Sequence, residues 1–206
     1  MDLRLAVLGD SIAFGQGATR PEDRLSSRLV RGLQDAAWTV RSRVVAVPGA
    51  RSAGLAAQVD LVEEDAPDVA VVVIGANDLT HFTPVDRAAA ALEDALRRLR
   101  SLGTEVVVAP APDMSAVPLV PVQLRPVVRE VSLRLRAAQA AAIRRHGAWL
   151  ADPAHTTSAA FEADASLFSA DHFHPSSEGY AVIAAALLPV VLDAAEAVRA
   201  TRTGAA

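Results

Sequence analysis

Short apolar runs alternate along the chain with longer amphipathic stretches. The runs are rich in valine and alanine, and they lie at residues 3–9, 42–49, 68–75, 104–110 and 148–153. Nearly continuous apolar runs are typical of strands in a parallel sheet, because helices cover both faces of such a sheet. The pattern therefore predicts five strands, most of them buried on both faces.

The amphipathic stretches predict long helices at residues 84–103, 120–147 and 176–200. The first of these has a proline near its start, arginines in its last turns and a glycine at its end, which is the order expected of helix start and stop signals. In the second, Pro126 is expected near the true first turn. The prolines and apolar residues of 111–126 indicate a loop over a pocket, or equally a packed surface loop.

Strands that alternate with helices predict an α/β fold. We expect one domain over residues 1–200, with a doubly wound, mainly parallel five-stranded sheet and helices on both faces. The expected strand order is 2-1-3-4-5, as in flavodoxin-like folds. A length of 206 residues suits a single domain. Residues 201–206 are expected to form a disordered tail.

Composition narrows the classes of function and partner. The net charge is −4 and the basic residues form no stripe, so nucleic acid is not expected as a partner. The longest apolar run, 181–192, is shorter than the ~18 residues of a membrane span, and the N-terminus lacks the pattern of a signal peptide. The absence of cysteine fits a reducing compartment. We therefore expect a cytoplasmic protein without stable membrane insertion, of unpredicted oligomeric state.

Chemically capable residues follow several of the predicted strands. The first strand runs into Gly9-Asp10-Ser11, the second into Pro48-Gly49-Ala50 and the third into Gly75-Ala76-Asn77-Asp78, while Asp171, His172 and His174 follow the fifth. Ligands of open α/β sheets bind beyond the carboxyl ends of the strands. In the order 2-1-3-4-5, Gly49, Ser11 and Asn77 would lie on three adjacent strands.

This set of residues suits acyl transfer. Ser11, at the first turn of a helix, would be a nucleophile, and it needs a histidine to take its proton and a carboxylate to orient that histidine. The backbone N–H groups of Ser11 and Gly49 and the side-chain amide of Asn77 could donate to one developing oxyanion. Asp171 and His174 are three residues apart and can share one side of a single turn.

Four segments resemble the conserved blocks of the SGNH hydrolases, also called GDSL-type esterases. They are LGDSIAFGQGA at 8–18, PGARS at 48–52, GAND at 75–78 and DHFHP at 171–175, and they occur in that family's order. The resemblance implies Ser11 as nucleophile, Gly49 and Asn77 as oxyanion donors, Asp171 with His174 completing the triad, and no cofactor. Ile12 stands where the family name has leucine, and this swap keeps the apolar character.

The sequence thus predicts a serine esterase or acylhydrolase that cleaves esters or thioesters of small or medium acyl groups, with a small-molecule acyl ester as its partner and no metal. The alternatives are an acyltransferase or a carbohydrate O-deacetylase with the same triad, and a non-catalytic binding module on the same fold. Substrate contacts are expected from Phe14, His81, Met114 and Leu119, although these residues could equally pack elsewhere.

Other interpretations of the same residues have weaker support. A metal site made of Asp171, His172 and His174 has no clear further ligand. ARSAG at 50–54 resembles a degenerate nucleophile elbow with Ser52 as nucleophile, but no accompanying blocks support it. Asp152 is an alternative triad acid. Asp10 and Asp78 are expected to fix loops by accepting backbone hydrogen bonds.

Overall fold

A five-stranded parallel sheet of order β2-β1-β3-β4-β5 organises the computed structural model, as predicted. The structure describes residues 1–204, apart from the side chains of residues 154 and 155. The strands are β1 (Asp2–Gly9), β2 (Thr39–Val44), β3 (Val69–Val73), β4 (Glu105–Ala109) and β5 (Trp149–Leu150).

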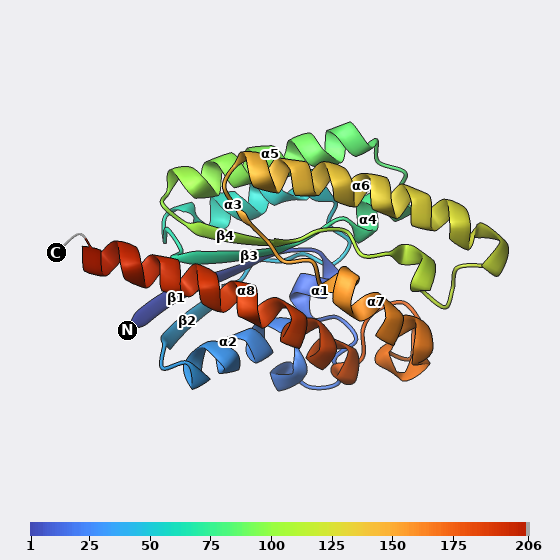
Figure 1. The fold of residues 1–206 in the computed structure, drawn as a ribbon, viewed down its shortest axis with the longest axis horizontal. Coiled ribbons are helices and arrows are strands. Elements are labelled where there is room, and N and C mark those ends of the chain that lie inside the picture. Colours follow the sequence, from blue (N-terminus) through green and yellow to red (C-terminus); the bar gives the residue numbers. More distant parts are fainter. Residues whose placement is uncertain (205–206) are drawn as a thin grey trace.

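Helices cover both faces of this sheet (Figure 1). They are α1 (Ser11–Phe14), α2 (Leu25–Asp35), α3 (Leu55–Glu63), α4 (Ala76–Thr80), α5 (Val85–Ser101), α6 (Arg125–Arg145), α7 (Pro153–Ala163) and α8 (Ser177–Gly204). In Figure 1, α3, α5 and α6 lie above the strands, and α2 and α8 lie below them.

Alternating strand residues supply two separate cores. Odd-numbered residues of β1 and β3, such as Val7 and Val71, pack against α2 and α8. Even-numbered neighbours, such as Leu8 and Val72, pack against α3, α5 and α6. Because successive side chains of a strand point to opposite faces, apolar runs without alternation are what a sheet covered on both faces needs.

The boundaries of two strands differ from the prediction. β2 begins three residues earlier than expected and ends at Val44, and most of its residues are exposed because it is an edge strand. Its backbone still follows β1 beyond the assigned strand, since Val47 N donates to Gly9 O at 3.0 Å. β5, also at an edge, has only two residues.

Helix ends agree with the local signals to within a few residues. Pro126 lies in the first turn of α6, as predicted. The segment 111–126 contains the short 3₁₀ helices η3 (Met114–Ala116) and η4 (Val122–Leu124). α8 continues to Gly204, so residues 201–204, which were expected in a disordered tail, are helical. Residues 205–206 lie outside the described part.

Among the helices that the structure describes, α8 alone has the length and apolar composition to cross a membrane. One face of α8 is buried against the sheet, with Tyr180, Leu187 and Val191 fully enclosed. This face of α8 forms part of the core that also contains α2.

A buried glutamine holds β3 and β4 where the two strands separate. Gln139 of α6 accepts a hydrogen bond from Ala111 N at 2.8 Å and donates to Ile74 O at 3.1 Å. Its amide replaces the strand-to-strand hydrogen bonds that are lost there, and buried backbone groups require such partners. The loops that follow β3 and β4 begin at this point, and residues in both line the candidate site.

Candidate active site

The turn from β1 into α1 presents Ser11. Gly9 has φ of 132°, and a Cβ on it would lie 1.8 Å from Val73 O, so only glycine fits between the two strands. Asp10 caps α1 by accepting a hydrogen bond from Ile12 N at 2.9 Å. Ser11 is the first residue of the helix and is nearly buried.

His174 links Ser11 to Asp171. Its Nε2 lies 3.1 Å from Ser11 Oγ, and its Nδ1 lies 2.7 Å from Asp171 Oδ2. Both distances are within hydrogen-bond range for a nucleophile, its base and the group that orients the base. The three side chains predicted to form a triad are therefore brought together from opposite ends of the chain.

The loop around Asp171 is closed by the other oxygen of its carboxylate. Asp171 Oδ1 accepts hydrogen bonds from Ser169 Oγ at 2.8 Å and from the backbone N–H groups of Phe173 and His174, both at 2.9 Å. His172 takes the left-handed conformation, with φ of 55°, so that the chain can turn back on the carboxylate. This leaves Oδ2 for the ring of His174.

These contacts keep Asp171 ionised. Desolvation opposes ionisation, but the hydrogen bonds from His174, Phe173 and Ser169 outweigh it and hold the pKa of Asp171 well below its usual range. A carboxylate that stays charged can orient the His174 ring and stabilise the imidazolium form of that ring.

Asn77 and Gly49, the predicted oxyanion donors, are connected through Ala50, which directly follows Gly49. Asn77 Nδ2 donates to Ala50 O at 3.1 Å, which occupies one of its two amide hydrogens. Gly49 has φ of 82°, while a Cβ on it would meet no protein atom within 4 Å. Glycine is therefore needed here for backbone conformation and not for space within the protein.

Ser52 is fixed by Asp78 in the interior. Its backbone N–H and its hydroxyl both donate to Asp78 Oδ2, at 2.9 and 2.7 Å, and its side chain is fully buried. These bonds tie the Gly49 loop to α4. A serine enclosed in this way is not presented to a substrate, so the alternative with Ser52 as nucleophile loses its support.

Asp10 and Asp78 place two carboxyl groups beneath the site. Both are almost fully buried, and each has one oxygen, Asp10 Oδ2 and Asp78 Oδ1, without a hydrogen-bond partner among the described residues. Burial, with the charge of Asp78 as a further cause, raises the pKa of Asp10 to about 7. The predicted loop-fixing role holds for both residues, since each accepts backbone hydrogen bonds.

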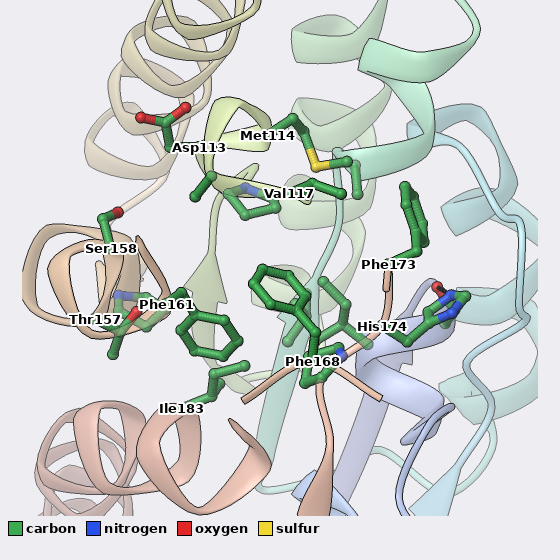
Figure 2. A pocket seen from close by; sticks show the side chains of 18 of the residues that line it. Asp113, Met114, Val117, Thr157, Ser158, Phe161, Phe168, Phe173, His174 and Ile183 are labelled. Atoms are coloured by element: carbon green, nitrogen blue, oxygen red, sulfur yellow. Dashed lines mark hydrogen bonds between the residues drawn. The ribbon is translucent and has the colours of Figure 1, made fainter. Parts of the chain in front are cut away.

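An apolar pocket opens beside Ser11 and His174 (Figure 2). It encloses about 100 Å³ between the ends of β3 and β4, η3, α7, α8 and the loop around residue 173. Three of the five phenylalanines of the chain line it, together with aliphatic side chains: Phe161, Phe168, Phe173, Met114, Val117 and Ile183.

Comparisons with known proteins identify the family of this chain. Residues 7–182 match the model of the GDSL-like lipase/acylhydrolase family. The chain belongs to this family. The resemblance to SGNH hydrolases that the four sequence blocks carry is thereby confirmed.

One relative of this GDSL-like chain is the GDSL-like esterase Rv1075c of Mycobacterium tuberculosis (strain ATCC 25618 / H37Rv). It is 36% identical over 197 residues, which make up 94% of this chain and 63% of the relative. The chain thus spans less than two thirds of that relative's length.

Solved structures share the fold. TesA superposes with a TM-score of 0.77 at 20% identity, covering 93% of this chain and 99% of its own. Axe2, an acetylxylan esterase from Geobacillus stearothermophilus, gives 0.70 at 19% identity, covering 92% and 94%. The psychrotrophic esterase EstA from Pseudoalteromonas sp. gives 0.73 at 16% identity, covering 93% and 98%.

Of the four residues expected to contact substrate, the pocket of this GDSL-like family member includes Met114 only. Phe14 stacks against Arg24, whose Cζ lies 5.2 Å from the centroid of the Phe14 ring. His81 Nδ1 is 2.9 Å from Asn77 O, so His81 supports the turn that carries Asn77. Leu119 is exposed outside the pocket.

The structure gives no support to the alternative metal site or to Asp152 as the triad acid. Among the side chains that the structure describes, no group of three or more histidine, aspartate or glutamate residues could hold a metal ion. His172 is exposed. Asp152 forms an ion pair with Arg136 of α6, whereas Asp171 holds His174. The phenylalanines in and before DHFHP are a sequence signal from which this pocket wall could have been predicted.

Proposed function

We propose that the protein is a serine esterase that cleaves esters of small or medium acyl groups through an acyl-enzyme on Ser11. The observation that carries this proposal is the continuous chain of contacts from Asp171 Oδ2 through His174 to Ser11 Oγ. Membership of the GDSL-like family supports the reaction class.

In the proposed reaction Ser11 Oγ attacks the acyl carbonyl while His174 Nε2 takes its proton. The oxyanion that forms receives hydrogen bonds from the N–H groups of Ser11 and Gly49 and from the free amide hydrogen of Asn77. His174 then protonates the leaving alcohol. A water molecule, deprotonated by His174, attacks the acyl-enzyme and releases the acid, which returns Ser11 to its starting state.

The pocket supports a hydrocarbon acyl group. Since one water-sized group needs roughly 10–15 Å³ of such space, the enclosed 100 Å³ offers room for a chain of several carbon atoms. Its aromatic and aliphatic walls favour a hydrocarbon chain over a sugar ring, which would leave hydroxyl groups unpaired. This preference separates the proposal from the carbohydrate O-deacetylase alternative, which the fold shared with Axe2 raises.

A fluorophosphonate probe tests the nucleophile directly. We expect mass spectrometry to find the adduct on Ser11 in the wild type, none in Ser11→Ala, and an unchanged adduct in Ser52→Ala. An EstA structure inhibited by monoethylphosphonate encourages the choice of probe. Failure of the probe to label Ser11 would favour the non-catalytic binding module.

Product analysis separates hydrolase from acyltransferase. With p-nitrophenyl butyrate and an added alcohol, a hydrolase releases mainly butyrate, whereas a transferase releases mainly the new ester. Ester versus thioester preference follows from the same assay with butyryl thioesters.

The cytoplasmic location stays a prediction.

A chain-length series tests the pocket. Ala116 lines it from η3, so Ala116→Phe should fill it. We expect the variant to lose roughly tenfold or more in kcat/KM for p-nitrophenyl octanoate, equivalent to 1.4 kcal/mol, and to change little for the acetate. Equal losses for both esters would place the acyl chain elsewhere.

A further inference from the structure

Two segments from different parts of the chain build the end of the acyl pocket farthest from the triad. Asp113 and η3 contribute one wall, and Thr157, Ser158 and Phe161 of α7 contribute the other. Figure 2 shows Asp113 and Ser158 on the opposite side of the pocket from His174. The spacing between η3 and α7 therefore decides where the pocket ends.

Arg129 of α6 contacts both walls. Its Nε donates to Asp113 Oδ2 at 3.1 Å and lies 3.4 Å from Ser115 Oγ. Its Nη2 forms an ion pair with Glu162, which belongs to α7. One guanidinium thus spans the junction between a wall from residues 113–116 and a wall from residues 153–163.

The two walls differ in how firmly they are held. Independently of Arg129, the segment before and within η3 is tied to α6 by Gln139, which bonds Ala111 N, and by Ser132, whose hydroxyl accepts from Met114 N at 3.3 Å. Both side chains are fully buried.

On α7, Glu162 is partly exposed, and exposed ion pairs are individually weak. Its neighbour Phe161 meets Phe168 edge-on, with ring centroids 5.1 Å apart. Loss of Arg129 should consequently let α7 move away from η3, while the packing of α7 against α8 and the position of η3 remain.

We propose that Arg129 is a positioning residue that limits acyl chain length by holding α7 against η3. The proposal rests on the proposed esterase function of the same site. Longer chains are accepted when the Arg129–Glu162 pair opens, and because salt screens exposed charges, the limit relaxes as ionic strength rises.

The test compares kcat/KM for p-nitrophenyl decanoate and butyrate, below their aggregation limits, in wild type, Arg129→Ala, Glu162→Gln and Arg134→Ala. Arg134 is the matched control, because it lies on the same helix and pairs with Glu130 within that helix. We expect the decanoate-to-butyrate ratio to rise roughly two- to fivefold in Arg129→Ala and Glu162→Gln, the factor that an exposed ion pair supplies, and to stay at the wild-type value in Arg134→Ala.

Salt provides a readout that a general loss of structure would not reproduce. Between about 20 and about 500 mM sodium chloride, where the screening length falls several-fold, the ratio should rise in the wild type and in Arg134→Ala but stay constant in the other two variants. Unchanged ratios in Arg129→Ala and Glu162→Gln, or an equal salt response in all four proteins, would overturn the proposal.

A binding measurement separates this proposal from the esterase function. In the Ser11→Ala background, decanoate and butyrate displace 8-anilinonaphthalene-1-sulfonate without any turnover. We expect Arg129→Ala to strengthen displacement by decanoate and to leave butyrate unchanged. If the wild type hydrolyses no ester but this shift occurs, only the esterase function fails. If esters are hydrolysed but neither ratio shifts, only the role of Arg129 fails.

Discussion

At the scale of single residues, the two carboxylate oxygens of Asp171 have different roles in the site. Asp171 Oδ1 closes its own loop by accepting three hydrogen bonds, and Oδ2 holds His174 Nδ1. The spacing of Asp171 and His174 made their pairing predictable. The hydrogen bond from Ser169 to Asp171 was not predictable from the spacing, because a serine two residues from an aspartate follows no helix or strand period.

Asp171→Asn should preserve the loop conformation and reduce the rate of ester hydrolysis. The asparagine oxygen can replace Oδ1, but an amide N–H in place of Oδ2 would face Nδ1 and favour the wrong tautomer of His174. We expect kcat to fall by about 10⁴-fold for a short ester, as for such changes in serine hydrolases.

Asp164→Asn is the matched control, since Asp164 makes the same kind of bonds, to Ser166 N and Oγ, in the cap of η5 (Ala165–Leu167). A similar loss in both variants would mean that Asp171 acts only as a loop cap.

Asp10 should make stability fall as pH rises. Its folded-state pKa of about 7 lies above the unfolded value, so its contribution to stability is fully present below about pH 4 and is lost as pH rises through about 7. Asp10→Asn keeps an acceptor for Ile12 N. We expect the variant to gain stability over the wild type with rising pH, by up to about 4 kcal/mol at pH 8.

Urea unfolding from pH 4 to 8 measures this difference, with Asp86→Asn as an exposed control in the first turn of α5. A gap between Asp10→Asn and wild type that does not change with pH would show that the Asp10 carboxyl does not titrate in this range.

At the scale of elements, periodicity located the strands and the long helices, and turn residues located their ends. The prediction placed β2 too far along the chain and made β5 too long, because an edge strand pairs on one side only and local sequence does not record where that pairing stops. α7 was not predicted, since its residues show hardly any amphipathic periodicity.

The separation of β3 from β4 should depend on Gln139. Gln139→Leu would leave Ala111 N–H and Ile74 C=O buried without partners, and each such group costs about 1–3 kcal/mol. We expect the free energy of unfolding to fall by about 2–5 kcal/mol in urea titrations. Gln123→Leu, at an exposed position of η4, is the control and should change it little. Equal effects would assign no special role to the Gln139 amide.

At the scale of the whole molecule, the sheet gathers residues from both ends of the chain at the carboxyl ends of its strands. Strand order therefore predicted that Gly49, Ser11 and Asn77 follow three adjacent strands, and the order β2-β1-β3 agrees with this. The pocket was less predictable, because its walls come from loops and from α7 and α8, whose side chains are placed by tertiary packing. Met114 was identified among them, while Phe14, His81 and Leu119 lie outside.

Hydrolysis of p-nitrophenyl butyrate by wild type, Ser11→Ala and Ser52→Ala tests the central claim most directly. We predict that Ser11→Ala loses at least about 10⁴-fold in kcat, while Ser52→Ala, which gives up one internal hydrogen bond, stays within about tenfold of wild type. Hydrolysis by Ser11→Ala at the wild-type rate would contradict the account.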